Sequence, residues 1–250
     1  PERSYAFSPL RFLWWASLLS GARAQQTIPF PASLNLSALA GVDGFVLNGE
    51  AAFDLSGTSV ASAGDLNGDN ITDLVIGAYG AKSDAGTSYV VFGRVGLGGS
   101  GSIALSSLDG TNGFVLNGQA RDESGCSVAS AGDVNGDKIA DLVIGAYAAN
   151  SNAGKSYVVF GRAGLGSTGN LALSSLNGTN GFALNGEAAN DQSGYSIAGV
   201  GDVNGDGIAD ILIAAPYANS HAHRSYVVFG RKLSNSTFLT TQAPTSPSST

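Results

Sequence analysis

The chain has 250 residues, enough for one or two ordinary domains, and 43% of them are hydrophobic, which excludes a wholly disordered protein. Only 12 residues are Lys or Arg against 19 Asp or Glu, and the net charge of −7 argues against nucleic acid or an anionic membrane surface as the partner. Cations are more natural partners for such a chain. Glycine, at 36 residues, indicates many tight turns and short strands rather than long helices.

The first 24 residues have the pattern of a secretory signal. Arg3 and Arg11 lie on the N-terminal side of an apolar run at residues 12–19. Ala22 and Ala24 then supply the small residues of an A-x-A cleavage site. Because a membrane span requires about 20 apolar residues, this run is too short to be one. We therefore predict a signal peptide at 1–24, a linker at 25–33, a secreted or extracellular-surface location, and no membrane span in this chain.

The start of the sequence and its cysteine content carry two further expectations. The sequence begins with Pro1 and contains no Met, so we expect it to be a fragment that lacks its start. Cys126 is the one cysteine and cannot form an internal disulfide. A secreted chain of this kind must be held together by something else.

The remainder of the chain consists of three copies of one unit. The segment "SYVVFG" begins at Ser88 and recurs 68 and then 69 residues later, at Ser156 and Ser225. Other segments recur with matching spacing, and such self-similarity indicates a repeat architecture. We place the units at 34–102, 103–170 and 171–238. The Ser/Thr/Pro-rich residues 239–250 are predicted to be a disordered or O-glycosylated tail.

Each unit contains four candidate strands. In the first unit they are "GFVLNG" at 44–49, "SVASAG" at 59–64, "DLVIGA" at 73–78 and "SYVVFG" at 88–93. Helical periodicity is absent outside the signal, apart from one turn at "ALSSL". Four strands per repeat are typical of a propeller blade, and blades must stack to bury their faces. The sequence therefore predicts an all-β fold of β-propeller-like blades with four antiparallel strands, in an open or incomplete propeller of three repeats.

The loop between the second and third strand candidates has the form D-x-N-G-D-x-x-x-D in every unit. Glycine permits a sharp turn that gathers the oxygens, and calcium takes about six to eight oxygen ligands, backbone carbonyls included. We predict about three calcium ions, one per repeat, with the Ile at position 7 offering its carbonyl while its side chain anchors in the core. The predicted ligands are Asp65, Asn67, Asp69, Ile71, Asp73, Asp133, Asn135, Asp137, Ile139, Asp141, Asp202, Asn204, Asp206, Ile208 and Asp210.

The loop differs from an EF-hand, which has Gly at position 6, Glu at position 12 and flanking helices. The alternative to a metal site is a polar turn closed by Asx and Gly residues. Three carboxylates in one short loop repel one another, and a divalent ion removes that repulsion. The threefold recurrence of all four side-chain oxygen positions favours metal.

These residues resemble the FG-GAP repeat of integrin α-subunit β-propellers over about 34–238. The resemblance is carried by the acidic loop and by the apolar strand that follows it. It implies calcium at the loop positions given above, and a role in adhesion or in binding an extracellular protein or glycan. The family's F-G is replaced by Ser-Gly at 56–57, 124–125 and 193–194, and only 214–216 keeps the Pro of G-A-P. Because integrin-type propellers have seven blades, three repeats imply an open arc, an incomplete propeller or self-association.

Several segments resemble nucleotide-binding, catalytic or metal-binding motifs, but we assign structural roles to them. The segments "GLGGSG" at 96–101 and "GLGSTG" at 164–169 match a dinucleotide fingerprint, but no helix follows them, so we interpret them as flexible inter-repeat loops. "GTSVA" and its two copies lack the last Gly of a nucleophile elbow. The pair His221 and His223 is assigned to a solvated loop, and Cys126 to a small strand residue. The recurring acids Asp54, Asp122 and Asp191 are assigned to turn caps.

We therefore predict that the chain is not an enzyme. Two other functions stay open: a non-catalytic accessory region of an extracellular hydrolase, since such repeats also occur in a glycosylphosphatidylinositol-specific phospholipase, and a structural surface or matrix protein. In a eukaryotic source we expect a glycoprotein. The N-x-S/T sequons are at Asn35, Asn70, Asn177 and Asn235.

Overall fold

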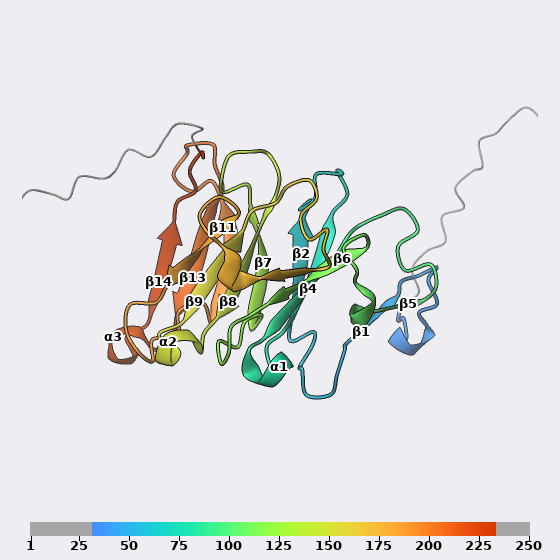
Figure 1. Cartoon of the computed structure of the whole chain (residues 1–250), viewed down its shortest axis with the longest axis horizontal. Coiled ribbons are helices and arrows are strands. Elements are labelled where there is room, and N and C mark those ends of the chain that lie inside the picture. Colours follow the sequence, from blue (N-terminus) through green and yellow to red (C-terminus); the bar gives the residue numbers. More distant parts are fainter. Residues whose placement is uncertain (1–31, 234–250) are drawn as a thin grey trace, which may run out of the picture. The chain divides into compact units, whose positions relative to one another are not determined.

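The computed structural model describes residues 32–233 and divides the chain into two units, 1–39 and 40–250 (Figure 1). In the first unit the described element is the short 3₁₀ helix η1 (Leu36–Ala38). The predicted signal at 1–24, the tail at 239–250 and the sequon at Asn235 lie outside the described residues, as does most of the predicted linker.

The second unit is built of short strands. They are β1 (Val46–Asn48), β2 (Ser59–Gly64), β3 (Asp73–Ala78), β4 (Thr87–Val91), β5 (Ser102–Ala104), β6 (Gly113–Asn117), β7 (Ser127–Gly132), β8 (Asp141–Ala146), β9 (Lys155–Val159), β10 (Asn170–Ala172), β11 (Gly181–Asn185), β12 (Ser196–Gly201), β13 (Asp210–Ala215) and β14 (Arg224–Val228). Single helical turns separate some of them: α1 (Ala81–Asp84), η2 (Leu105–Ser107), α2 (Ala149–Asn152), η3 (Leu173–Ser175) and α3 (Ala218–His221). The all-β prediction is confirmed.

The strands form propeller blades. In the first blade β2, β3 and β4 follow one another as antiparallel neighbours, and β6 completes the blade on the far side of β4. The second blade has the same order, β7-β8-β9-β11, and the third consists of β12-β13-β14. The inner strands β2, β7 and β12 pack side by side (Figure 1). Since β14 and β1 are not paired with each other, the described blades form an open propeller.

Each blade is offset by one strand from the sequence repeat. The sequence pattern suggested that the four strands of one repeat form one blade, and the structure corrects this. The first strand of each later repeat pairs with the last strand of the preceding one, with Phe114 opposite Val90 and Phe182 opposite Val158. A spacing of 68 or 69 residues fixes the period of a repeat but not its phase, so the pairing could not be read from it. Consecutive blades are consequently interlocked through a shared strand.

Strand β1 is the sequence equivalent of the outer strands β6 and β11, but it completes no blade. It pairs in parallel with β5, with Leu47 opposite Ile103. In the same way β6 pairs in parallel with β10, with Leu116 opposite Leu171. In the part of the chain that the structure describes, β1 has no antiparallel neighbour equivalent to β4 or β9.

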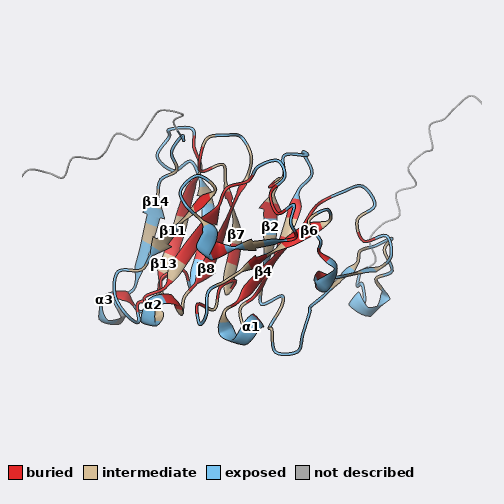
Figure 2. Cartoon of the chain, viewed as in Figure 1, coloured by how far each residue is buried: buried red, intermediate tan, exposed pale blue. Residues whose placement is uncertain are grey.

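The core lies on the middle strands and between the blades (Figure 2). All six residues of β8 are buried. Between the first two blades the apolar cluster combines side chains of both, among them Phe92, Phe114 and Leu142. Leu165, near the end of the second repeat, and Leu173, in the third, also belong to it. The third blade lacks such a cover on its outer strand, where Val227 is 50% exposed and Phe229 is 57% exposed.

The turns between strands show one departure from the sequence analysis, at the glycine-rich segments. The turns α1, α2 and α3 contain residues with left-handed backbone, such as Asn150 and Ser151, and are not regular helices. The glycine-rich segments at 96–101 and 164–169 are packed turns rather than free linkers. A Cβ on Gly98 or Gly166 would lie 2.1 Å from the ring of Phe45 or Phe114, respectively. The helical turn expected at "ALSSL" is present as η2 and η3.

Within the described residues, no helix has the length and apolar character needed to cross a membrane.

Candidate metal loops

The acidic loops connect the inner strand of each blade to the second strand, between β2 and β3, β7 and β8, and β12 and β13. A shift of register near the end of each inner strand leads into the loop; in the first blade it falls between Ser62 and Gly64. Gly64 has a left-handed φ of 74°, which a residue with a side chain adopts at a cost. The bulge and its glycine place the first aspartate of the motif directly at the start of the turn.

The first aspartate organises the loop. In the first blade Oδ1 of Asp65 accepts hydrogen bonds from the backbone N–H of Gly68 at 2.7 Å and of Asp69 at 3.0 Å. Its Oδ2 accepts from Asn70 N at 2.8 Å. Asp133 and Asp202 make the equivalent three bonds in the other loops. These aspartates satisfy backbone donors that the sharp turn leaves without partners.

The residues at positions 3 and 5 continue the same pattern. Asn67 Oδ1 accepts from Asp69 N at 2.9 Å, and Asp69 Oδ1 accepts from Ile71 N at 2.8 Å. The amide of Asn67 also donates to Asp69 Oδ2 at 3.2 Å. The second and third loops repeat these bonds. The loop is a chain of Asx-type turns.

The last aspartate is buried and joins the loop to the third strand of its blade. Asp141 Oδ2 accepts from Val134 N and its Oδ1 accepts from Gly161 N, each at 2.9 Å. Asp73 and Asp210 hold the corresponding amides, and all three carboxylates have an exposed fraction of 0%. The position that closes the predicted ligand set is therefore also a structural anchor.

Burial and like charge disfavour ionisation of the closing aspartate. Desolvation raises the pKa of Asp141 to about 7, the two backbone amides lower it, and the charges of Asp137 and Asp133 raise it further. The pKa of Asp73 is raised by the same causes. The first aspartate of the third loop behaves oppositely, since the backbone N–H of Gly207 and its neighbours lower the pKa of Asp202. A divalent cation between the carboxylates would relieve the repulsion in the first two loops.

The fit to calcium is good in donor chemistry and incomplete in geometry. The loops offer carboxylate, amide and carbonyl oxygens, the donors that calcium prefers, and each carboxylate oxygen has more than one lone pair. Across residues 32–233, however, no three His, Cys, Asp or Glu side chains gather closely enough to hold an ion. The side chains are instead turned toward backbone amides. The observed bonds match the Asx/Gly turn that was the alternative, and calcium binding stays a prediction.

The isoleucine at position 7 was predicted to anchor in the core. Ile208 is 7% exposed and fits this prediction, whereas Ile71 is 38% exposed and does not. In each blade the Ile also packs on the glycine after the third strand: a Cβ on Gly93 would lie 2.6 Å from Ile71 Cγ2. One branch of the side chain is covered by this contact, so the rest of Ile71 reaches solvent.

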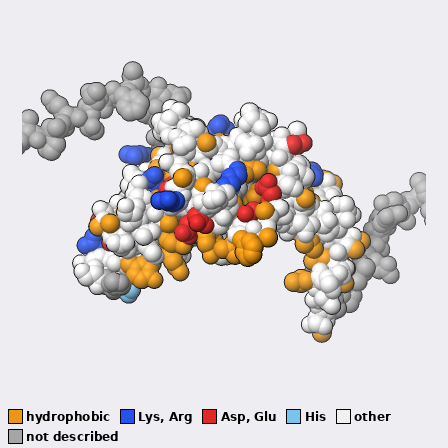
Figure 3. All heavy atoms as spheres, turned by 60° about the horizontal axis from the view of Figure 1, so that its bottom comes forward, with side chains coloured by type: hydrophobic (Ala, Val, Ile, Leu, Met, Phe, Trp, Pro, Cys, Tyr) orange, Lys and Arg blue, Asp and Glu red, His pale blue; other side chains and the backbone are white. Residues whose placement is uncertain are grey.

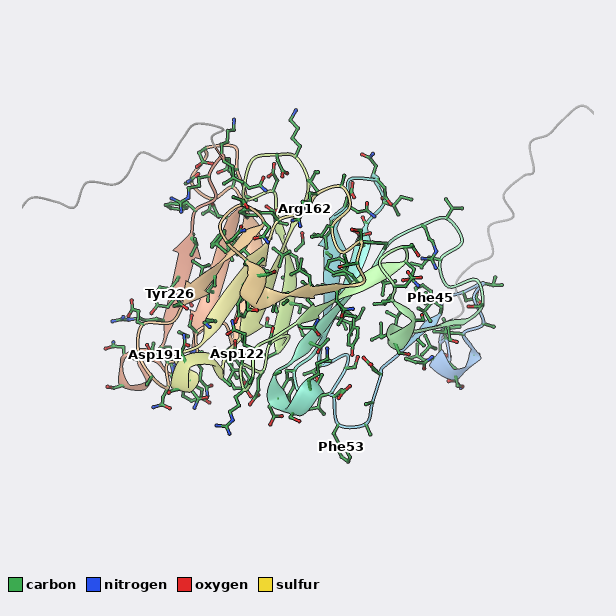
Figure 4. The ribbon with its side chains drawn as sticks, in the orientation of Figure 1. Phe45, Phe53, Asp122, Arg162, Asp191 and Tyr226 are labelled. Carbon is green, nitrogen blue, oxygen red and sulfur yellow. The ribbon has the colours of Figure 1, made fainter. Side chains whose placement is uncertain are left out.

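The first two loops also hold neighbouring blades together, which the sequence analysis missed. Ala140 N donates to Asp65 O at 3.1 Å, and Ala209 N donates to Asp133 O at 3.0 Å. Arg162 N, at the end of the molecule where these loops lie (Figure 4), donates to Leu66 O at 2.9 Å. These partners are far apart in sequence, so no local signal identifies them. The first two loops are therefore tied to the next blade through their backbone.

The other residues considered in the sequence have structural surroundings. Burial raises the pKa of the Cys126 thiol to about 11, and its Sγ donates to Gly194 O at 3.6 Å. His223 contacts Pro216 O through Nδ1. Asp191 accepts from Ala188 N at 3.2 Å, as a turn cap does (Figure 4).

The acid in the second repeat differs from the predicted turn cap. Asp122 is buried and accepts a hydrogen bond of 2.6 Å from the hydroxyl of Tyr157. The carboxylate is therefore a core acceptor that fixes the third strand of its blade.

The fold and the loops define a class of protein: repeats of β-propeller blades, each with an acidic Asx-bonded loop between its first two strands. A family profile described as "FG-GAP repeat" matches residues 56–91, 127–159 and 193–228. These ranges contain the first three strands of each blade, β2–β4, β7–β9 and β12–β14. The chain contains three FG-GAP repeats.

Curated relatives include integrin alpha subunits. Integrin alpha-V of Gallus gallus is 35% identical over 174 residues, covering 67% of this chain and 14% of the relative. Integrin alpha-3 of Cricetulus griseus is 30% identical over 173 residues, covering 68% of this chain and 15% of the relative. The chain thus spans only a small part of the length of these integrins.

Proposed function

We propose that this chain is a secreted, calcium-binding, integrin-α-like propeller-repeat protein that binds an extracellular protein or glycan in adhesion. The observation that supports it best is the acidic loop, present three times with one geometry. In the second loop a buried aspartate, Asp141, lies within electrostatic reach of Asp133 and Asp137. The charges of two carboxylates that help to raise the pKa of a third favour a hard divalent cation, and the side chains would turn from the backbone amides to bind it.

Calcium would act through the residues that hold it. The carboxylates at positions 1, 5 and 9, the amide at position 3 and the carbonyl at position 7 would bind the ion. The ion would supply positive charge that offsets the mutual repulsion of the carboxylates. Because the backbone of the first loop accepts a hydrogen bond from Ala140 in the second, an ordered loop would also fix the stacking of adjacent blades.

Calorimetric titration of calcium into the chain, purified with chelator and then freed of it, tests the metal part of the proposal. Extracellular calcium modules bind at about 0.1–1 mM, and we expect about three sites in that range. Absence of binding up to several millimolar would overturn the proposal and leave the loops as polar turns.

A matched pair of variants assigns the sites. Asp133→Asn replaces one charged predicted ligand by a neutral amide, which weakens the site, and is expected to lower the stoichiometry by one ion. Asp109→Asn is the control, because Asp109 caps an exposed turn outside the loops and the third repeat has Asn177 at the equivalent position. A stoichiometry that falls equally in both variants would argue against the loop as the site.

The end of the molecule opposite the acidic loops offers a surface for a ligand. Figure 3 brings the end with α1 to α3 forward and shows hydrophobic side chains on it. Phe53, which projects from this end in Figure 4, is 91% exposed, and Leu55 and Tyr195 are about half exposed. Exposed apolar groups of this kind are common where proteins bind partners.

Adhesion is tested by counting cells that attach to a surface coated with the chain. The buffer contains either calcium at an extracellular concentration of about 2 mM or chelator. We expect calcium-dependent attachment that is reduced when Phe53 is replaced by Ser. Equal attachment to the chain and to an albumin coating would contradict the adhesive role.

A further inference from the structure

The third blade has an unpaired edge. Strand β14 pairs with β13 on one side, and its other side has no strand among the described residues. In the first two blades this side is filled by β6 and β11, and the backbone N–H groups of Phe92 and Phe160 donate to Asn112 O and Asn180 O at 3.0 and 3.1 Å. The equivalent Phe229 has no such acceptor in residues 32–233.

The strand that fills the other two edges has a constant sequence. It is "GFVLN" in β6 and "GFALN" in β11. Its phenylalanine packs on the phenylalanine after the third strand, with ring centroids 5.7 Å apart for Phe114 and Phe92 and 5.8 Å apart for Phe182 and Phe160. Under this cover Phe160 is 5% exposed, against 57% for the uncovered Phe229.

The chain carries a third copy of this strand that completes no blade. Residues 44–48 read "GFVLN", identical to β6, and include β1. This segment has a parallel neighbour in β5 but, in the part of the chain described, no antiparallel one. A further "GF-x-LN" segment does not occur in the sequence after β14. One molecule therefore presents both an empty edge and the strand that matches it.

An apolar hollow lies beside β14. Its volume is about 340 Å³, and it is lined mainly by apolar side chains, among them Phe182, Leu184, Ile211, Val228 and Phe229. Between the first two blades the equivalent space is filled by leucines of the next repeat, Leu171 and Leu173.

The leucines that would fill the hollow have counterparts ahead of β1. In the sequence Leu34 and Leu36 precede Phe45 by the same intervals at which Leu171 and Leu173 precede Phe182. Residues 33–48 thus contain the complete set of groups that closes a blade.

We propose that two copies of this chain associate by reciprocal strand addition, the segment 33–48 of each completing the third blade of the other. The register of the blades within one chain would place Gly44 opposite Val228 and Val46 opposite Tyr226. Each copy gives one strand and accepts one, so the exchange completes the third blade of both copies and forms a ring of six blades. Closed propellers typically have about four to eight blades.

The junction between copies differs in one respect from the junctions within a chain. A Cβ on Gly145 would lie 2.0 Å from Gly194 O, and one on Gly154 would lie 2.0 Å from Ser193 O, so both glycines admit the loop that follows the added strand. The third blade has Ala214 and His223 at these positions. The loop after residue 48 of the donating copy therefore leaves the third blade of the accepting copy by a wider path.

The mass of the full chain in solution, measured by light scattering after gel filtration from low to high micromolar concentration, tests the proposal. One chain has a mass of 25.0 kDa, and we expect a species of twice that mass that dissociates on dilution. A chain that stays at 25.0 kDa throughout overturns the proposal and leaves the edge for a segment of another protein or of a longer chain.

Two variants locate the junction. Phe45→Asp puts a charge where the strand must bury a ring, and Val227→Pro removes a backbone donor of the free edge. By alternation from Phe92 N, which faces β6, the N–H of Val227 faces outward, so the pairing of β14 with β13 keeps its hydrogen bonds. We expect at least about tenfold weaker association for each. The control Val95→Asp, at a valine that is 96% exposed, should associate as the parent does.

Mixing the two variants guards against loss of folding as the explanation. Phe45→Asp keeps a good edge and Val227→Pro keeps a good strand, so the mixture can form one junction that neither variant forms alone. We expect a one-to-one complex of the two. A mixture that remains monomeric, or a dimer that both substitutions leave unchanged, overturns the assignment to this strand and edge.

Discussion

At the scale of single residues, the closing aspartate of each acidic loop serves two requirements. Its sequence position identifies it as a potential cation ligand, and the structure shows that it also accepts two buried backbone N–H groups. Asp141 does this for Val134 and Gly161. Burial disfavours the ionised form of Asp141. An acidic residue is nevertheless needed at this position, because the two buried amides require an acceptor.

Asp141→Ala is therefore expected to destabilise the fold even without calcium. The change leaves two buried donors unsatisfied, and each unsatisfied group costs about 1–3 kcal/mol. Urea denaturation in the presence of chelator measures the loss, with Asp109→Asn as an exposed control expected to change stability little, since Asn177 caps the equivalent turn. An unchanged midpoint for Asp141→Ala would show that the loop relaxes to satisfy these amides.

The thiol of Cys126 gives a prediction from its raised pKa. At a pKa of about 11, only about one thiol in a thousand is ionised at pH 8, and the thiolate is the reactive form. We expect a disulfide reagent to modify the native chain at least about 100-fold more slowly than the chain unfolded in guanidinium. Raising the pH toward 10 should accelerate the native reaction. Rapid labelling of the native chain at pH 8 would show that the thiol is accessible and ionised.

At the scale of elements, the sequence predicted where strands lie better than how they pair. The candidates at 59–64 and 73–78 coincide with β2 and β3, because Val, Ile and alternating small residues between Gly and Asp clusters are local signals. The place of β6 beside β4 was not predictable, since pairing depends on contacts across the blade and not on local pattern. For the same reason the motif marked the loop positions but not their hydrogen bonds to the next blade.

The shared strand gives a prediction about blade cohesion. Phe114 is fully buried on β6, and truncation to Ala leaves a cavity between two blades, which typically costs about 3–5 kcal/mol. Phe53→Ala, at an exposed site, should change stability by less than about 0.5 kcal/mol. Denaturant unfolding of both variants provides the comparison. Equal losses would mean that β6 contributes little to the first blade.

At the scale of the whole molecule, the chain is a set of blades joined by two kinds of link. One is the strand that each later repeat adds to the preceding blade. The other is the backbone contact between successive acidic loops, Ala140 to Asp65 and Ala209 to Asp133. The two links lie on different parts of the blades. Calcium would act on the contact between the loops, whereas the hydrophobic core holds the added strand in place.

Calcium is accordingly expected to stabilise the whole chain and not only its loops. A site that binds at about 0.1 mM contributes roughly 1.8 kcal/mol in 2 mM calcium, which in a chain of this size raises the unfolding temperature by about 4–7 °C. Thermal unfolding with calcium, with magnesium and with chelator measures the effect, and magnesium should give a smaller shift because it demands a stricter geometry. Asp133→Asn should reduce the calcium shift, since its loop joins the second and third blades, whereas Asp109→Asn should not. Because the three loops act on one stacked set of blades, a single cooperative transition is expected to move. A calcium shift confined to a minor, separate transition would instead mean that the loops bind the ion without coupling the blades.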